Sequence, residues 1–186
     1  MVIFALSIIA LYFLTHLFLR FGLQKSISLR IVNPNPKNKV SIVVAAKNEE
    51  KIISKCIASL KELSYPKENL EIFLINDKST DTTKEIMLKE TEGLDYFKVI
   101  DSSSENGSNL KGKANALDTA IKQAKGEFIL GTDADCLVNK DWVQETIKYY
   151  DDETAMVCGI TYINFSQSVF HKMQALDWVY LQTLAS

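Results

Sequence analysis

Short apolar runs alternate with helix-like segments over most of this chain, and that alternation limits the folds that it can adopt. In the helix-like segments, apolar residues recur at helical spacing, as Ile53, Ile57 and Leu60 do. Strands separated by helices of this length predict βαβ units, and therefore an α/β fold with a mostly parallel sheet. The predicted strands cover residues 40–46, 70–76, 97–101, 127–132 and 155–160, and the predicted helices cover residues 50–63, 114–124 and 140–150, with a shorter one opened by a capping box at Thr82 and Glu85.

Acidic residues follow two of the predicted strands. Asp77 comes after the strand at residues 70–76, and Asp133 and Asp135 stand in the sequence GTDAD after an apolar run. Right-handed crossovers place the carboxyl ends of parallel strands along one edge of the sheet, where ligands bind in such folds. A solvated loop would also explain a D-x-D pair, although each carboxylate makes the ionisation of the other less favourable. A divalent cation between them would offset that repulsion.

Other polar residues are expected at the same edge. Asn48 and Glu49 follow the first strand, at a helix start whose backbone amides favour anions, although ordinary helix capping explains them equally well. Lys113 also stands at a helix start, where a cation opposes the helix dipole unless an anion is held nearby; an ordinary surface lysine is the alternative. Carboxylates grouped with one lysine suit a hard cation, Mg²⁺ or Mn²⁺, together with a diphosphate.

Several other kinds of site are disfavoured. The segment GSNLKGKA is close to a P-loop, but Ala114 replaces the hydroxyl residue that would reach Mg²⁺, and no G-x-G-x-x-G follows the first strand. Histidine occurs only at positions 16 and 171, which argues against a histidine-based triad or a zinc site. The net charge of −2, from 21 basic and 23 acidic residues, gives no reason to expect a nucleic-acid partner.

The N-terminal segment predicts a membrane anchor. Residues 1–19 carry no side chain charged at neutral pH and would span roughly 28 Å as a helix, close to the ~30 Å core of a bilayer. We therefore expect a transmembrane anchor at residues 1–23 and a basic, Asn/Pro-containing linker at residues 24–39. A cleaved signal peptide is the alternative, but no basic segment precedes the apolar run and no A-x-A-like site follows it. The basic flank predicts that the globular part faces the cytoplasm.

The cysteines agree with a reducing compartment. Cys56, Cys136 and Cys158 are an odd number without metal-ligand spacing, and each has apolar neighbours. We interpret them as reduced thiols in the protein core.

Four segments in order give the chain a family resemblance. VSIVVAAKNEE, LINDKSTDTT, GKANAL and GEFILGTDAD resemble the inverting glycosyltransferases of family 2, which have the GT-A fold, and the resemblance covers residues 40–159. It implies that residues 40–186 form a GT-A domain that binds a nucleotide sugar, usually a UDP-sugar, with Mg²⁺ or Mn²⁺. Bacterial members with a membrane anchor suggest a membrane-proximal acceptor, either lipid-linked or a saccharide, and a role in polysaccharide biosynthesis.

The resemblance also implies roles for individual residues. Asp77 matches the aspartate that contacts the base, and Asn76 replaces the first of the two successive aspartates that are commoner there. Asp133 matches the D-x-D residue near the ribose and the metal, and Asp135 matches the direct metal ligand. The implied nucleotide contacts are Ala45, Lys47, Asn48, Glu49, Asp77, Lys113 and Asp133.

The family's catalytic base, a later carboxylate usually in an E-D pair, is not found where the resemblance would place it. Asp177 is the one late candidate, but its helical spacing with apolar residues indicates packing, so we do not assign it as the base. We expect the base beyond Ser186, in which case the chain is a truncated form. The alternatives are a non-catalytic, membrane-tethered module that binds nucleotide sugars and a nucleotidyltransferase, although the latter usually has a glycine-rich, basic N-terminal loop.

Overall fold

The computed structural model describes residues 2–26, 31–32, 36–103, 110–159, 161–162, 168, 172–175 and 178, and within its first helix the side chains of residues 6–7, 9–18 and 21. The chain divides into two compact units. Asn33–Tyr150 forms one unit, and Met1–Val32 together with Asp151–Ser186 forms the other. The strands all lie in the first of these units.

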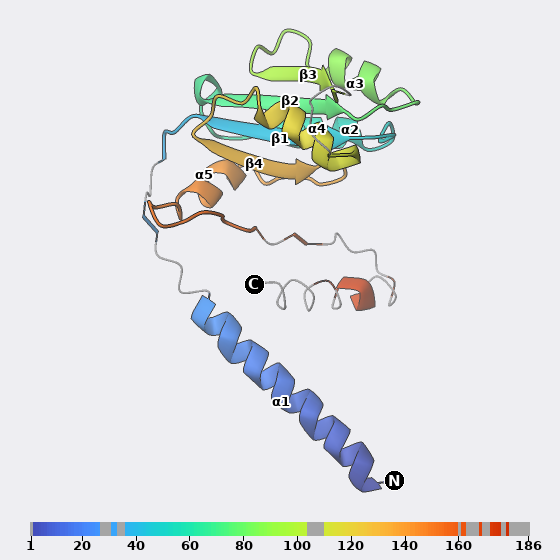
Figure 1. Ribbon diagram of the computed structural model, residues 1–186, viewed down its shortest axis with the longest axis vertical. Coiled ribbons are helices and arrows are strands. Elements are labelled where there is room, and N and C mark those ends of the chain that lie inside the picture. Colours follow the sequence, from blue (N-terminus) through green and yellow to red (C-terminus); the bar gives the residue numbers. More distant parts are fainter. Residues whose placement is uncertain are drawn as a thin grey trace. The chain divides into compact units, whose positions relative to one another are not determined.

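A four-stranded parallel sheet forms the centre of the unit Asn33–Tyr150 (Figure 1). Its order is β3-β2-β1-β4, and each neighbouring pair is parallel. The predicted α/β fold with a parallel sheet is therefore confirmed. The strands are β1 (Val40–Ala46), β2 (Leu70–Asn76), β3 (Phe97–Asp101) and β4 (Phe128–Asp133).

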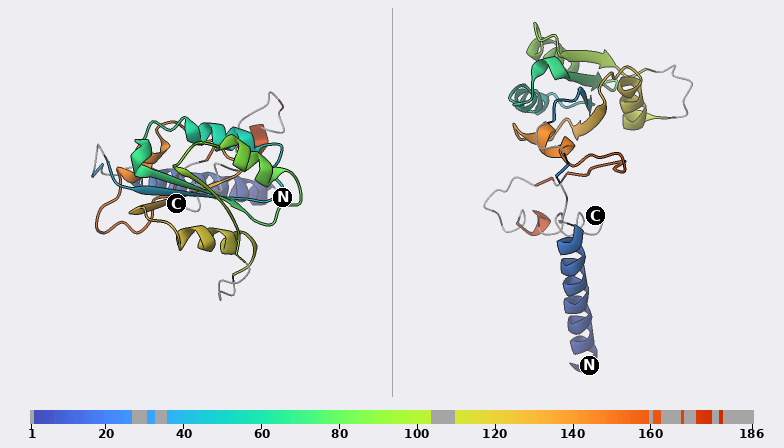
Figure 2. Two further views of the ribbon diagram at one scale, coloured as in Figure 1. Left: turned by 90° about the horizontal axis from the view of Figure 1, so that it is seen from above. Right: turned by 90° about the vertical axis from the view of Figure 1, so that its left-hand side faces the viewer.

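Helices cover both faces of the sheet, as the left view of Figure 2 shows. Alternate residues of β1 face opposite layers, because successive side chains of a strand point to opposite faces. Ile42 and Val44 belong to the larger core cluster, which includes residues of α2 (Ile53–Lys61), α3 (Thr83–Glu90) and α5 (Trp142–Ile147). Val43 belongs to the smaller cluster with Phe73, Ile75, Ala116 and Ala120, the last two from α4 (Gly112–Ile121). A short 3₁₀ turn, η1 (Lys67–Asn69), precedes β2.

Most predicted elements are found, with shorter helices than expected. The strands at residues 40–46, 70–76 and 97–101 have the predicted bounds, and β4 is shifted by one residue. The helix predicted at residues 50–63 is confined to Ile53–Lys61 because the preceding residues bond to another loop. The backbone nitrogen of Glu50, for example, donates to Asp81 Oδ2 at 3.3 Å.

Three local interpretations are wrong. Thr82 is the N-cap of α3, but it makes no side-chain capping bond; its hydroxyl donates to Glu50 Oε2 at 2.8 Å. The strand predicted at residues 155–160 is absent over residues 155–159, the described part, where Met156 is 74% exposed and the backbone pairs with no strand that the structure describes. Cys158 lies in that segment and is exposed rather than in the core, whereas Cys56 is buried; all three cysteines are free.

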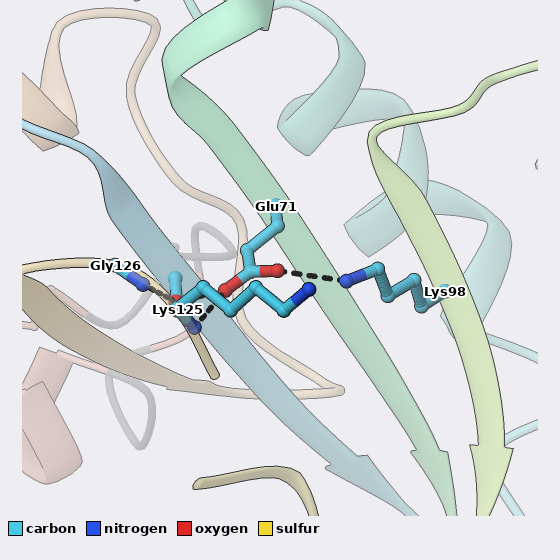
Figure 3. Close-up of polar contacts among 5 residues, drawn as sticks. Glu71, Lys98, Lys125 and Gly126 are labelled. Atoms are coloured by element: carbon cyan, nitrogen blue, oxygen red, sulfur yellow. Dashed lines mark hydrogen bonds and ion pairs between the residues drawn. The ribbon is translucent and has the colours of Figure 1, made fainter. Parts of the chain in front are cut away.

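A half-buried polar network ties the amino-terminal end of the sheet together (Figure 3). Glu71 on β2 accepts hydrogen bonds from Ser41 Oγ at 2.6 Å, from the backbone nitrogen of Lys125 and from Lys98 Nζ at 2.8 Å. Ser41 Oγ in turn accepts a bond from the backbone nitrogen of Gly126 at 2.8 Å. Burial alone would raise the pKa of Glu71, but the bonds from Lys98, Ser41 and Lys125 lower it to about 2. The carboxylate therefore stays charged and links β1, β2, β3 and the segment before β4.

The N-terminal segment forms a long helix, α1 (Val2–Ser26). Many of its described side chains are apolar and exposed, among them Phe13, Leu14 and Phe18. His16 packs its ring against Tyr12, with ring centroids 4.2 Å apart. Among the described residues, no helix has both the length and the apolar character needed to cross a membrane, so the predicted transmembrane anchor lacks support from the structure.

Candidate functional site

The carboxyl ends of the strands bring the predicted polar residues to one edge of the sheet. Asp133, the last residue of β4, is in register with Ala45 on β1. Ala46, the last residue of β1, is in register with Asn76 on β2. Asp77 follows Asn76, and its backbone nitrogen donates to the carbonyl of Ala46 at 2.8 Å. Asp77 and Asp133 therefore flank the end of β1 on opposite sides.

Asp77 is the most enclosed acidic residue at this edge. It is 7% exposed, and its Oδ1 accepts a hydrogen bond of 2.9 Å from the hydroxyl of Ser102, directly after β3. The hydroxyl and the loop geometry hold this carboxylate in one place, whereas an exposed aspartate would sample several rotamers.

Asn76 has a different environment from its neighbour Asp77. Its Nδ2 donates to Asp101 Oδ1 at 2.8 Å, and its Oδ1 accepts a bond from the backbone nitrogen of Ser79 at 3.1 Å. Asp101 also forms an ion pair with Lys84, with Nζ 2.6 Å from Oδ2. The hydrogen bonds from Lys84 and Asn76 lower the pKa of Asp101. Both ends of the Asn76 amide are thus engaged within the protein, so this residue orders the loop after β2.

The loops after β1 and β2 are joined by side-chain bonds. Asn48 has a left-handed backbone, with φ of 57°. Its backbone nitrogen donates to Ser79 Oγ at 3.1 Å, and its side-chain Oδ1 accepts from the backbone nitrogen of Thr80 at 2.8 Å. The nitrogen of Glu49 donates to Thr83 Oγ1 at 2.8 Å. Asp81 accepts from both the nitrogen and the hydroxyl of Thr83, which lowers the pKa of Asp81 despite the opposing effect of desolvation. Asn48 therefore clamps two loops together.

The other predicted contacts of this stretch, Ala45 and Lys47, differ in accessibility. Ala45 is half-buried within β1, and Lys47 is exposed just after the strand ends. Only the backbone of Ala45 is placed by the sheet itself, next to Asp133.

Lys113 and Asp133 meet directly. Lys113 lies in the first turn of α4, and its Nζ is 2.5 Å from Asp133 Oδ1. Both side chains are more than half exposed, so the pair is accessible to a ligand from solvent. An ammonium group beside this carboxylate places one positive charge where the sequence predicts metal and diphosphate.

Asp135 follows in the turn after β4 and is exposed. Its Oδ1 lies 3.7 Å from the thiol of Cys136, and the carbonyl of Asp133 accepts contacts from the nitrogen of Cys136 at 3.1 Å and the thiol of Cys56 at 3.8 Å. Burial, followed by the nearby charges of Cys136 and Asp135, raises the pKa of Cys56 to about 12. Burial, followed by Asp135 and Asp133, also raises the pKa of Cys136. Both thiols are therefore protonated at pH 7 in the structure as described.

The donor set fits a hard cation that is shared with its ligand. Asp133 and Asp135 offer carboxylate oxygens, which Mg²⁺ and Mn²⁺ prefer. Among the described residues, no group of three or more acidic, histidine or cysteine side chains is arranged to hold a metal ion. Two carboxylates with phosphate oxygens and water completing the shell are a usual arrangement for Mg²⁺. The structure is therefore compatible with a cation that binds together with a diphosphate.

Sequence reasoning missed Ser102, and it recognised Asn76 only as a departure from the family pattern. The parallel register of β2 and β3 accounts for both residues. Asn76 and Asp101 are in register at the ends of these strands, and Asp77 and Ser102 are the residues that directly follow them. Asp177, considered above as a base, lies outside the described residues.

Comparisons with known proteins assign the chain to a family. The sequence profile of glycosyl transferase family 2 matches residues 41–183. The chain belongs to glycosyl transferase family 2. It is 33% identical over 138 residues to a probable glycosyltransferase, YdaM, of Bacillus subtilis, and 30% identical over 175 residues to the poly-beta-1,6-N-acetyl-D-glucosamine synthase of Staphylococcus aureus strain COL. These matches cover 70% and 92% of this chain, but only 32% and 40% of the two relatives.

Solved structures of similar proteins agree with the fold. A mannosyltransferase from Pyrobaculum calidifontis, in complex with GDP-Man and Mn²⁺, is similar with a TM-score of 0.66 and 26% identity, over 81% of this chain and 44% of that protein. TarS residues 1–349 from Staphylococcus aureus are similar with a TM-score of 0.50 and 32% identity, over 57% of this chain and 30% of that protein. The GT-A-like fold expected for family 2 is thereby confirmed.

Proposed function

We propose that this chain binds a nucleoside-diphosphate sugar at the carboxyl edge of its sheet and serves the transfer of that sugar to an acceptor. The observation that carries the proposal is the placement of Asp77 and Asp133 on either side of the end of β1, with Lys113 paired to Asp133. A similar mannosyltransferase whose structure contains GDP-Man and Mn²⁺ supports a nucleotide-sugar donor and a divalent cation. The resemblance to family 2 favours a UDP-sugar.

Each residue has a distinct part in donor binding. Asp77 would accept an N–H group of the base, Lys113 would move from Asp133 to the diphosphate, and Asp133 and Asp135 would hold the cation. The cation, when bound, supplies Lewis acidity that stabilises charge on the leaving diphosphate. Transfer also needs a general base within hydrogen-bond reach of the acceptor hydroxyl. Because this chain spans 32% and 40% of the two relatives named above, we assign it donor binding and leave the base unassigned.

Donor binding is tested by calorimetry on the 186-residue chain with UDP and GDP, each with and without Mn²⁺. We expect micromolar to millimolar binding that requires the cation, and its loss in Asp135→Ala. Asp152→Ala is the matched control, because Asp152 is also an exposed aspartate but lies outside the sheet unit. Equal binding by Asp135→Ala and the parent chain would disprove the assignment of the cation site, and no binding of either nucleotide by the parent would disprove the function.

We also propose that α1 attaches the protein to a membrane and that the sheet unit lies on the cytoplasmic side. The exposed apolar side chains of α1 and the basic residues that follow it support attachment. A membrane-proximal acceptor, lipid-linked or a growing saccharide, would fit that location. Flotation with liposomes tests the proposal: the full chain should float, and a variant lacking residues 1–26 should stay at the bottom. Equal behaviour of the two would contradict it.

A further inference from the structure

The Asp77 carboxylate accepts a hydrogen bond from the side chain of Ser102. Its hydroxyl donates to Asp77 Oδ1 at 2.9 Å, and both residues are 7% exposed. Removing a partner from a hydrogen bond to a buried carboxylate is costly, because the charge is left without the compensation that burial requires. Loss of this hydrogen bond should therefore cost more free energy than loss of a hydrogen bond at an exposed surface.

The backbones of both residues are fixed by the sheet. The nitrogen of Asp77 donates to the carbonyl of Ala46 at 2.8 Å, which extends the pairing of β1 with β2 by one step. The nitrogen of Ser102 donates to the carbonyl of Asn76 at 2.9 Å, which extends the pairing of β2 with β3 in the same way. Neither residue lies in a free loop. The Asp77–Ser102 pair is consequently as rigid as the ends of the strands.

The residues that precede Asp77 and Ser102 also bond to each other through their side chains. Asn76 and Asp101 are in register, and Asn76 Nδ2 donates to Asp101 Oδ1 at 2.8 Å. Lys84 from α3 neutralises Asp101 through an ion pair of 2.6 Å. Two consecutive cross-strand pairs therefore join β2 to β3 through their side chains at the carboxyl end. The first pair is neutralised by Lys84, whereas the second leaves the Asp77 carboxylate as an acceptor with one hydroxyl donor.

We propose that Ser102 is a positioning residue that orients the Asp77 carboxylate to read the base of the donor nucleotide. This inference rests on the proposed function, in which Asp77 accepts an N–H group of the base. An ionised carboxylate only accepts hydrogen bonds. Uracil and guanine each present a ring N–H on the edge used for base pairing, whereas cytosine presents an unprotonated ring nitrogen there. With its rotamer fixed by Ser102, Asp77 favours UDP and GDP over CDP.

The inference predicts a change in selectivity as well as in affinity. A loosely held carboxylate still attracts an N–H group, but it binds less well because the ligand must order it. Against CDP, a carboxylate aligned for a ring N–H meets the lone pair of the cytosine ring nitrogen and can accept only from the 4-amino group beside it, so a loss of its order changes CDP affinity less. Removal of the Ser102 hydroxyl should therefore reduce the preference for UDP or GDP over CDP.

The experiment compares the parent chain, Ser102→Ala, Ser102→Thr and Thr91→Val by calorimetry with UDP, GDP and CDP in the presence of Mn²⁺. Thr91→Val is the matched control, because it removes another buried hydroxyl, one that donates to the carbonyl of Met87 at 2.8 Å within the α3 region. We expect Ser102→Ala to weaken binding of the preferred nucleotide about tenfold and to leave CDP within about twofold. Ser102→Thr, which keeps the hydroxyl, should restore most of the preference, and Thr91→Val should keep it fully.

An unchanged ratio of affinities in Ser102→Ala, while the parent chain binds UDP or GDP, would overturn the inference. An equal fall for all three nucleotides is one such result and would indicate a purely structural role. If Ser102→Ala does not fold, Ser102→Cys, whose thiol is a weaker donor, should give an intermediate ratio, and an unchanged ratio there would also overturn it. Failure of the parent chain to bind any nucleotide would instead overturn the proposed function itself.

Discussion

Lys113 and Asp133 form an ion pair across the carboxyl edge of the sheet, between the first turn of α4 and the last residue of β4. Both partners are more than half exposed, so the pair adds little to stability. The pair keeps the ammonium group of Lys113 beside Asp133, the first carboxylate of the D-x-D sequence, when no ligand is bound. The arrival of a divalent cation with a diphosphate would give Asp133 a new partner and release Lys113 to the phosphates.

Replacing Lys113 should therefore separate ligand binding from stability. We expect Lys113→Met to change the free energy of unfolding by less than about 1 kcal/mol, because the pair is exposed, and to weaken UDP binding in the presence of Mn²⁺ about tenfold, because a charge contact with the diphosphate is lost. Urea unfolding and calorimetry measure the two effects. Lys122→Met is the control, since Lys122, the C-cap of α4, is 51% exposed and pairs with Asp118 in that helix. Equal UDP affinity in Lys113→Met and Lys122→Met would contradict the role of Lys113.

The sequence predicts the strands better than the helices, for a physical reason. The two central strands of the parallel sheet are buried on both faces, so Val40–Ala46 and Leu70–Asn76 are apolar runs with clear ends. A helix is apolar on one side only, and the pattern continues into neighbouring loops. Thr82 shows the limit: its position suits a capping box, but Glu50, 32 residues earlier in the chain, takes its hydroxyl.

The site also contains residues that the sequence predicts and one that it does not. Asp77, Asp133 and Asp135 are acidic residues within a few positions of the end of an apolar run, and that pattern predicts that they lie at the carboxyl edge of the sheet. Ser102 is an ordinary serine in a polar stretch, and only the register of β2 with β3 reveals its contact with Asp77. Partners that depend on pairing between distant strands are not visible in a single sequence.

Glu71 should make the stability of the sheet depend on acidic pH. The pKa of its carboxyl is about 2 in the folded protein, below the ordinary value of 4.5 that it has when unfolded. The unfolded chain therefore binds the proton more tightly, and the stabilisation is full above pH 4.5 and is lost as the pH falls toward 2. Its size is on the order of 2 kcal/mol, because the side chain is well enclosed and the shift is large.

Urea unfolding between pH 2 and pH 6 measures this dependence. Glu71→Gln should lower stability at pH 6 and flatten the profile below pH 4.5, because the titrating group has been removed. Glu145→Gln is the matched control, since Glu145 is 59% exposed and pairs with Lys148 at the C-cap of α5. An acid profile of Glu71→Gln with the same slope as the parent chain would contradict the role given to the network.

Thiol reactivity should follow burial and thiol pKa. Cys158 is exposed, whereas Cys56 is buried with its pKa raised to about 12 by burial and by nearby negative charges. Thiolate is the reactive form, so Cys56 should resist alkylation at pH 8. Iodoacetamide followed by mass spectrometry should label Cys158 in the native protein and Cys56 only after unfolding in urea. Labelling of both cysteines at equal rates without urea would show that the core around Cys56 opens readily.

Gly126 makes the closest backbone approach in the network around Glu71, and its substitution gives the most direct test of the packing there. A Cβ at this position would lie 2.4 Å from the backbone nitrogen of Ser41 and 2.8 Å from the carbonyl carbon of Val40. Backbone atoms of a central strand have little freedom to move, so the segment before β4 must shift and its bond to Ser41 Oγ must lengthen. We expect Gly126→Ala to destabilise the protein by about 1–3 kcal/mol.

The same substitution at Gly131 provides the comparison, because a Cβ there would meet only Val43 Cγ2, at an ordinary contact distance of 3.9 Å. Gly131 lies within β4, whereas Gly126 lies two residues before that strand. Urea unfolding should show a clear loss for Gly126→Ala and a small change for Gly131→Ala. Because the Glu71 network lies at the opposite end of the strands from Asp77 and Asp133, folded Gly126→Ala should bind nucleotide like the parent chain; equal stability of the two glycine variants would contradict the close packing of Gly126 against Ser41.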